Sequence, residues 1–240
     1  EDEAMVRQSA GEMLSILSGT DEFLAEAIAA GGRMRDYFSG LVEDRRRSPR
    51  DDVISSLADG DIDGRPLPNE EIFGMCLIIY LAGNTTTSAL ISNGLYVLAE
   101  HPDQRARLAA DLGVMEGAVE ELLRYESPVQ WTSRVTTTDV EMYDQVIPAG
   151  DRVLMLIGAA HRDPRQWDRP DAFDVFRPAQ RHVAFGDGVH RCIGAPLARL
   201  EGRIALELVL DRIPDYEVAG EIERMYISTE RGLARLPVKV

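Results

Sequence analysis

The sequence predicts a mainly helical fold with small β-sheets. Apolar residues recur at spacings of three and four over most of the chain up to Tyr125, and again after Cys192, which is typical of amphipathic helices. Short runs rich in β-branched residues, separated by proline and glycine turns, follow Pro128 and indicate strands. A glycine-rich stretch, residues 182–196, comes directly before the last long helical pattern and contains a cysteine.

Composition narrows the class of protein before any motif is considered. The 240-residue chain has a net charge of −15, with 45% hydrophobic and 28% charged residues, which is typical of a soluble globular protein. We expect no apolar run long enough to cross a bilayer, and no nucleic-acid partner, since phosphate binding needs a basic surface. The two cysteines, Cys76 and Cys192, predict no disulfide framework and suit a reducing cytoplasm.

Four helical stretches are expected in the first part of the chain. Their ranges are 1–19, 21–47, 51–58, and a long one that Asn69 caps and that ends at His101-Pro102. Gly31 and Gly32 can interrupt the second helix. Residues 59–68, rich in Gly, Asp and Pro, are expected to form a turn before the long helix.

The middle of the long helix has poor helix chemistry. Residues 81–87 combine Gly83 with three consecutive threonines, Thr85 to Thr87. Threonine hydroxyls can bond to the preceding turn, which predicts a local opening where a small ligand could sit. A polar kink without a ligand is the alternative that this stretch leaves open.

Helices and strands alternate after His101. Helices are expected over 102–112 and 115–125, and strands over 134–140 and 152–157 on either side of a turn at 148–150. Two more strands, 215–218 and 236–240, are expected near the end of the chain. By spacing alone, Glu121 and Arg124 would form a surface ion pair of little energetic value.

The glycine-rich stretch carries the chemistry. Gly186, Gly188 and Gly194 allow a tight loop whose bare backbone can approach a flat ligand. The helical pattern that follows places Cys192 at the start of a helix. There the helix dipole and the neighbouring Arg191 favour a thiolate over a thiol, and a thiolate is a metal ligand.

The residues Phe185, Gly188, Arg191, Cys192 and Gly194 resemble the pattern F-x-x-G-x-x-x-C-x-G of the haem-binding loop of cytochrome P450. The resemblance, to the soluble bacterial type, covers the C-terminal part of that fold, rather more than half of it. It implies that residues 1–240 are a single haem-thiolate domain without the family's N-terminal helices. It also implies haem b as cofactor, with Cys192 as the axial ligand of the iron.

A second motif lies on the long helix. Ala82, Gly83, Thr86 and Thr87 resemble the A-G-x-[DE]-T-T motif that the family places over the oxygen-binding face of the haem. Thr86, with Thr85 beside it, is therefore implied to be catalytic. Thr85 stands where the family usually has a carboxylate, so the usual route of proton delivery is in question.

The resemblance implies roles for further residues. Glu121 and Arg124 match the family's E-x-x-R, and with Arg177 they would form a buried structural network. In addition to Cys192, three residues are implied to bind the haem propionates: Arg134, His182 and His190. The other implied cofactor-binding residues are Phe185, Gly186, Gly194, Ala82 and Gly83. The implied substrate pocket contains Ile79, Val129, Trp131 and Ile227, although each also suits an ordinary core position.

The implied function is a cytoplasmic haem-thiolate monooxygenase that uses O₂ to hydroxylate an apolar small molecule. Its electrons would come from a ferredoxin-type carrier at a locally basic face near Cys192, where Arg191, Arg199 and Arg203 outnumber the acidic residues. A peroxide-driven peroxygenase, or a haem-free relative that binds partner proteins, are the alternatives. The sequence names neither the substrate nor the redox partner.

Overall fold

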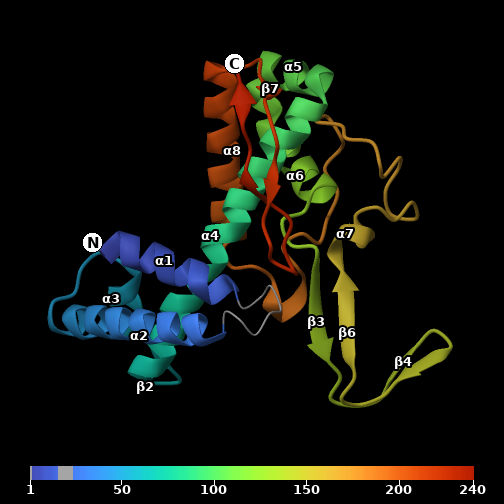
Figure 1. Ribbon diagram of the computed structural model, residues 1–240. Helices are drawn as coiled ribbons and strands as arrows, with labels where there is room; N and C mark the ends of the chain where they lie inside the picture. Colours follow the sequence, from blue (N-terminus) through green and yellow to red (C-terminus); the bar gives the residue numbers. More distant parts are fainter. Residues whose placement is uncertain (1, 16–23) are drawn as a thin grey trace. The chain divides into compact units, whose positions relative to one another are not determined.

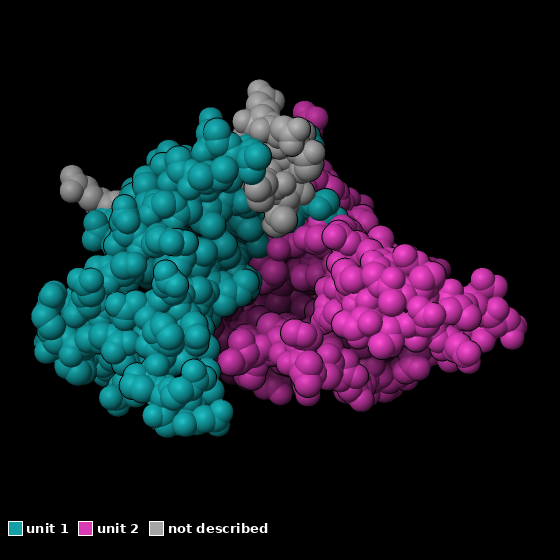
Figure 2. Space-filling model, turned by 90° about the horizontal axis from the view of Figure 1, so that it is seen from below, with its two compact units in different colours: residues 1–85, 226–228 teal, residues 86–225, 229–240 magenta. Residues whose placement is uncertain are grey.

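The computed structural model describes residues 2–15 and 24–240. The chain divides into two compact units, coloured separately in Figure 2. The first contains the described residues up to Thr85 and residues 226–228, and the second contains the rest. The helix α4 (Asn69–Glu100) contributes residues to both (Figure 1).

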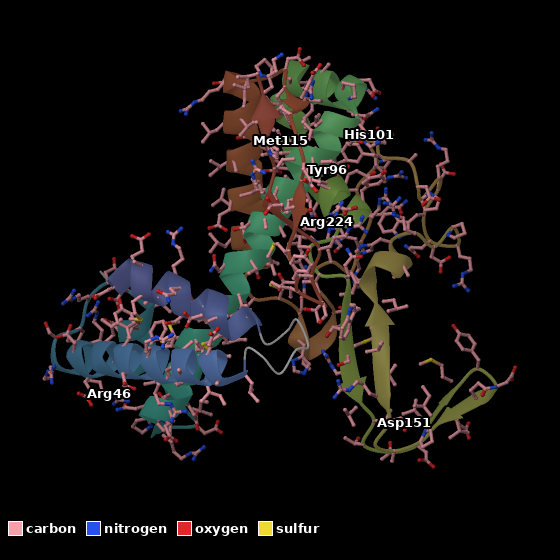
Figure 3. The ribbon with its side chains drawn as sticks, in the orientation of Figure 1. Arg46, Tyr96, His101, Met115, Asp151 and Arg224 are labelled. Atoms are coloured by element: carbon pink, nitrogen blue, oxygen red, sulfur yellow. The ribbon has the colours of Figure 1, made fainter. Side chains whose placement is uncertain are left out.

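The first unit is built on two packed helices, α1 (Asp2–Ser15) and α2 (Leu24–Arg47). The short helix α3 (Val53–Ala58) and the hairpin of β1 (Asp61–Ile62) and β2 (Arg65–Pro66) lead into α4. Figure 3 labels Arg46, whose guanidinium donates to the carbonyl of Leu67 at 2.8 Å. The core of the first unit consists of Val6, Met34, Phe38, Val42, Leu67, Ile72 and Cys76.

Two expectations for this unit need correction. Gly31 and Gly32 do not interrupt α2, because the buried residues on either side, Ala30 and Met34, hold this part of the helix in the core. The expected turn at 59–68 contains the β1–β2 hairpin. The expected ends of the first two helices, at residues 16–19 and 21–23, lie outside the described residues.

The second unit has its core between α4, α6 (Met115–Tyr125) and α8 (Ala195–Arg212). The helix α5 (Pro102–Ala110) and the 3-10 turn η3 (Leu112–Val114) join α4 to α6. Met115, labelled in Figure 3, is fully buried in this core. His101, at the junction of α4 and α5, packs against Tyr125 and Phe173.

The strands of the second unit form separate antiparallel pairs. The longest pair is β3 (Trp131–Val135) with β6 (Arg152–Leu156). Just beyond the ends of this pair, the N–H of Thr136 donates to the carbonyl of Asp151 at 3.0 Å; Figure 3 labels Asp151. The other pairs are β4 (Val140–Met142) with β5 (Gln145–Ile147), β7 (Glu217–Val218) with β10 (Val238–Lys239), and β8 (Glu223–Arg224) with β9 (Leu233–Arg235). Short helical turns α7 (Ile157–Ala160) and η4 (Gly188–His190) complete this unit.

The sequence therefore predicts the fold class correctly but not every strand. The strand expected over 134–140 ends at Val135, and residues 136–139 are a turn before β4. The β8–β9 pair was not expected, and Arg224 of β8 stacks on Tyr96 of α4 at 5.9 Å (Figure 3). Strands of two or three residues leave too little alternation to be recognised in the sequence.

The long helix differs from the expectation in two ways. It is helical without interruption from Asn69 to Glu100, so the predicted opening at residues 81–87 is wrong. The hydroxyl of Thr85 is buried and has no hydrogen-bond partner, so it does not bond to the preceding turn. By length and composition, moreover, α4 is apolar enough to cross a membrane, with a mean hydropathy of 1.4 over 18 residues, contrary to our expectation. In this chain, its residues Ile72, Leu90 and Leu98 belong to the two cores.

Close packing between α4, α6 and α8 gives a test of this fold. A Cβ on Gly202 of α8 would lie 2.8 Å from Cδ2 of Leu90, which is 1% exposed and cannot move away freely. Gly202→Ala should therefore lower the free energy of unfolding by about 1–3 kcal/mol. Urea denaturation of the purified protein measures this.

The matched control for this test is Gly117→Ala on α6. A Cβ there meets nothing within 4 Å. Because alanine is the better helix former by about 1 kcal/mol, this variant should be as stable as the unsubstituted protein or more stable. Equal stability of the two variants would contradict the described packing.

Candidate haem-thiolate site

The loop that ends at Cys192 is closed by its own backbone. The N–H of Gly186 donates to the carbonyl of Val183 at 2.9 Å, and the N–H of Cys192 donates to the carbonyl of Phe185 at 2.9 Å. Gly186 and Gly188 have φ angles of 68° and 69°, which side chains disfavour. The loop turns back on itself and presents Cys192 just before α8.

The exposed side of this loop suits a planar, iron-containing cofactor. The thiol of Cys192 is free and exposed, and a thiolate is a soft ligand for iron. Val189 and Ile193 of the same loop are 98% and 92% exposed, so the loop presents apolar side chains as well as the thiol. A Cβ on Gly188 would meet nothing within 4 Å, so this glycine leaves bare backbone facing open space. These residues fit haem b.

The residues expected to bind haem propionates lie in different surroundings. Arg134 is exposed on β3, where its guanidinium donates to the carbonyl of Ser133 at 2.8 Å, and His190 is exposed in the loop. Each can donate to a carboxylate. His182 cannot, because Nε2 bonds to Glu120 at 3.0 Å and Nδ1 accepts the N–H of Ala184 at 3.2 Å. This corrects the expectation for His182.

Glu121, Arg124 and Arg177 form one buried ion-pair network. The Arg124 guanidinium donates to both carboxylate oxygens of Glu121, from Nε at 2.7 Å and Nη2 at 2.9 Å. Nε of Arg177 lies 3.1 and 3.0 Å from the same two oxygens. The side chains of Glu121, Arg124 and Arg177 are 2%, 1% and 10% exposed, so this is not the surface pair that spacing alone suggests.

The two guanidiniums also satisfy backbone carbonyls of a segment without strands. Arg124 donates to the carbonyls of His161, Pro170 and Ala172 at 2.8–3.1 Å. Arg177 donates to those of Asp168, Arg169 and Ala172 at 2.7–3.2 Å. Because residues 161–172 have few carbonyl partners in regular structure, the guanidiniums determine the course of the segment that leads to the Cys192 loop.

A second network, which the sequence did not reveal, lies at the start of the loop. Glu120 of α6 accepts two hydrogen bonds from Arg199 of α8, at 2.6 and 2.9 Å, besides the one from His182. The Arg199 guanidinium lies 4.5 Å from the ring centroid of Phe185. The partners of Glu120 are 62 and 79 residues away in sequence, so no local pattern could identify this contact.

Burial and charge fix the protonation of these groups. Burial opposes ionisation of Glu120, but hydrogen bonds from His182 and Arg199 outweigh it and lower its pKa to about 2. The pKa of His161 is lowered to about 4 by burial first, and then by nearby positive charges that include the guanidiniums of Arg124 and Arg162. Neutral His161 accepts the N–H of Val183 on Nε2 at 3.0 Å, so it holds the loop entry through an unprotonated nitrogen.

The basic face expected near Cys192 is largely neutralised. Arg199 is paired with Glu120, and Arg203 lies 2.8 Å from Glu116 of α6. Counting residues along the chain missed these pairs because the acidic partners are on another helix. Arg191 remains exposed beside the cysteine.

The residues expected on the oxygen-binding side of the haem and in the substrate pocket are divided between the two units. Ala82, Gly83, Thr85, Ile79 and Ile227 belong to the first unit. Thr86, Val129 and Trp131 belong to the second. Ile79 is exposed, and Val129, Trp131 and Ile227 are half-buried, so none of these four is a fully buried core residue.

The buried network predicts a large loss of stability in one variant. Glu121→Ala would leave two guanidiniums without their carboxylate, and we expect a cost of about 3–5 kcal/mol in the free energy of unfolding and loss of haem binding. Glu121→Ala combined with Arg124→Ala should cost far less than the sum of the two single changes. Urea denaturation and haem titration measure this.

An exposed pair on the same helix serves as control. Glu116, 80% exposed, pairs with Arg203, and Glu116→Ala should change stability by less than about 1 kcal/mol. Normal haem content in the Glu121→Ala protein would be incompatible with the structural role assigned to the network.

His161 predicts a specific dependence of stability on pH. Its pKa is about 4 in the folded chain and about 6.5 when unfolded, so between these values the unfolded state binds the additional proton. The contribution of neutral His161 is complete above pH 6.5 and is lost as the pH falls to about 4, by up to about 3 kcal/mol.

Urea denaturation of the unsubstituted protein and of His161→Asn measures this contribution. As the pH falls through that window, the unsubstituted protein should lose stability relative to the variant. Parallel pH profiles of the two proteins would rule out the protonation state assigned to His161.

Comparison with known proteins identifies the family of this chain. The family described as Cytochrome P450 matches residues 13–213. The chain is 44% identical over 230 residues to the cytochrome P450 monooxygenase PikC of Streptomyces venezuelae, covering 92% of this chain and 55% of that protein. It is 37% identical to the biotin biosynthesis cytochrome P450 of Bacillus subtilis, over 99% of this chain and 61% of that protein.

Solved structures show the same fold. The structure of P450BioI, solved in complex with hexadec-9Z-enoic acid ligated to acyl carrier protein, matches 97% of this chain and 61% of its own with a TM-score of 0.91 and 37% identity. PksS of Bacillus subtilis matches 99% and 62% with a TM-score of 0.93 and 36% identity. The chain therefore spans 55% and 61% of the length of the two curated relatives named above. It belongs to the cytochrome P450 family.

Proposed function

We propose that this chain carries the haem-ligating part of a monooxygenase that inserts one atom of O₂ into an apolar small molecule. The observation that carries the proposal is the exposed thiol of Cys192, held just before α8 by a glycine loop that also presents exposed apolar side chains. Haem b bound here supplies the iron that activates O₂, with the thiolate donating electron density that favours O–O cleavage.

The chain's own residues have separate tasks in this proposal. Cys192 binds the iron, and the N–H of Cys192 stays bonded to Phe185, which fixes the direction of the thiolate. Arg134 and His190 bind the propionates and so orient the macrocycle. The half-buried residues Val129 and Trp131 exclude water from an apolar substrate.

Electrons come from a ferredoxin-type carrier in the cytoplasm in this proposal. The carrier docks near the Cys192 loop, where the exposed Arg191 supplies positive charge. The pairing of Arg199 and Arg203 with α6 makes this face less basic than the sequence suggests.

One substitution tests the ligand. In the haem-loaded protein, Cys192→His should remove the red-shifted Soret band of the reduced, CO-treated thiolate complex while the far-UV circular dichroism is retained. Cys76→Ser is the matched control, because Cys76 is buried in the core of the first unit, and it should keep the band. Survival of the band in Cys192→His would show that another residue is the ligand. A spectrum without any haem would favour the haem-free alternative.

The alternative of a peroxide-driven enzyme is favoured by one observation at residue 85. A carboxylate can exchange protons near neutral pH, whereas a threonine hydroxyl cannot. The buried, unpartnered Oγ1 of Thr85 can only hold a water. We propose that protons reach the oxygen-binding side of the haem through a water chain ordered by Thr86 and Asn84, rather than arriving with peroxide.

Coupling of electrons to product distinguishes these two routes. With O₂ and a reductase system, Thr86→Ala should divert several-fold more electrons to hydrogen peroxide than the unsubstituted protein does, while Thr85→Glu should leave O₂-dependent turnover unchanged or faster. NADPH consumption against product formation measures the coupling. Full coupling in Thr86→Ala, together with efficient turnover on peroxide alone, would favour the peroxygenase.

A further inference from the structure

The Cys192 loop has two ends, and one carboxylate bonds to both. His182 lies where the chain enters the loop, and Arg199 lies in the second turn of α8, after the cysteine. Oε2 of Glu120 is 3.0 Å from Nε2 of His182 and 2.9 Å from Nη2 of Arg199, and Oε1 is 2.6 Å from Nε of Arg199. Glu120 thus links the two sides of the loop through α6.

The entry segment depends on side chains for its hydrogen bonds. Residues 182–185 belong to no helix or strand. The N–H of Val183 donates to His161, and the N–H of Ala184 donates to Nδ1 of His182, so imidazoles replace a regular ladder. His182 can accept on Nδ1 and donate from Nε2 only in one tautomer, and Glu120 is the acceptor that selects it.

Arg199, on the C-terminal side of the loop, is connected to the cysteine through Phe185. Nε and Nη2 of Arg199 grip the two oxygens of Glu120, which fixes the guanidinium plane. That guanidinium lies 4.5 Å from the ring centroid of Phe185. The carbonyl of Phe185 accepts the N–H of Cys192, so a displaced Phe185 would displace the cysteine.

We propose that Glu120 is a positioning residue for the haem ligand: by bonding to His182 and Arg199 together, it sets the position of the Cys192 thiolate. This rests on the proposed haem-binding function. Glu120 touches neither the cysteine nor the substrate in this proposal and acts through the two loop ends. Because hydrogen bonds hold the pKa of Glu120 near 2 against burial, its carboxylate is ionised near neutral pH.

Neighbouring residues on α6 carry different tasks. Glu121 faces Arg124 and Arg177 and orders residues 161–172, whereas Glu120 faces the loop itself. Loss of Glu121 should therefore lower global stability, while loss of Glu120 should mainly loosen the loop. The exposed fractions agree with this division, since Glu121 is 2% exposed and Glu120 is 28% exposed.

The test uses Glu120→Gln, which keeps the shape of the side chain and removes its charge. Amide hydrogen exchange of residues 183–192 should rise about tenfold or more, which corresponds to about 1.4 kcal/mol of local opening. In the haem-loaded protein, the reduced CO complex should lose a large fraction of its thiolate band to a form without thiolate ligation. Arg199→Lys should show a smaller change of both kinds, because it keeps the charge but loses the two-point grip.

Glu116→Gln is the matched control. It removes another α6–α8 ion pair, the one with Arg203, without touching either end of the loop. It should leave loop exchange and the CO spectrum as in the unsubstituted protein. Equal loosening by Glu116→Gln, or no loosening by Glu120→Gln, would overturn the proposal.

The two measurements also separate this proposal from the proposed function. A loosened loop with an unchanged thiolate band in Glu120→Gln would overturn the positioning role while leaving haem ligation intact. If the unsubstituted protein binds no haem, the proposed function fails, and with it the role of Glu120 toward a ligand.

Discussion

The second unit depends on the carboxylate of Glu121 between two guanidiniums. Residues 161–181 contain no strand and no helix beyond short turns, so their carbonyls need partners from elsewhere. Arg124 and Arg177 supply these partners, and the two guanidiniums can stay buried because both pair with the carboxylate of Glu121 and donate their other N–H groups to backbone carbonyls. The ion pair is thus a condition for the irregular segment to have one conformation, and the Cys192 loop follows directly from that segment.

The helix α6 serves both the segment and the loop because consecutive helical residues point about 100° apart. Glu121 therefore reaches toward Asp174 and Arg177, and Glu120 toward His182 and Arg199. His161 connects the two networks. Its carbonyl accepts from Arg124 while its ring accepts from Val183, so movement of the first network would reach the loop entry through one residue.

Local sequence patterns predict most of the helices. They do not predict contacts between residues that are far apart along the chain. The bounds of α6 match the expected 115–125, because an apolar face and clear ends specify them. Gly31 and Gly32 were recognised as residues that can interrupt a helix, but burial of Ala30 and Met34 outweighs their poor propensity. The threonines of α4 likewise stay helical because Ala89 and Leu90 after them are buried. The pairing of Glu120 with Arg199 has no local signal, since it depends on how α6 and α8 pack.

The glycines show most clearly where sequence reasoning stops. At three positions the neighbouring atoms leave no room for a side chain: Gly94, Gly202 and Gly232. A Cβ on Gly232, for example, would lie 2.7 Å from Cβ of Ala89. At Gly186 and Gly188 the nearest atoms leave room for a Cβ, so only the positive φ angles and whatever approaches from outside require glycine. The sequence singles out the two loop glycines by their motif, but nothing in it marks Gly94, Gly202 and Gly232 as positions without room for a side chain. In the structure, the packing of the protein itself does not require the missing side chains of Gly186 and Gly188. A loop that faces a flat cofactor requires this kind of bare, accessible backbone.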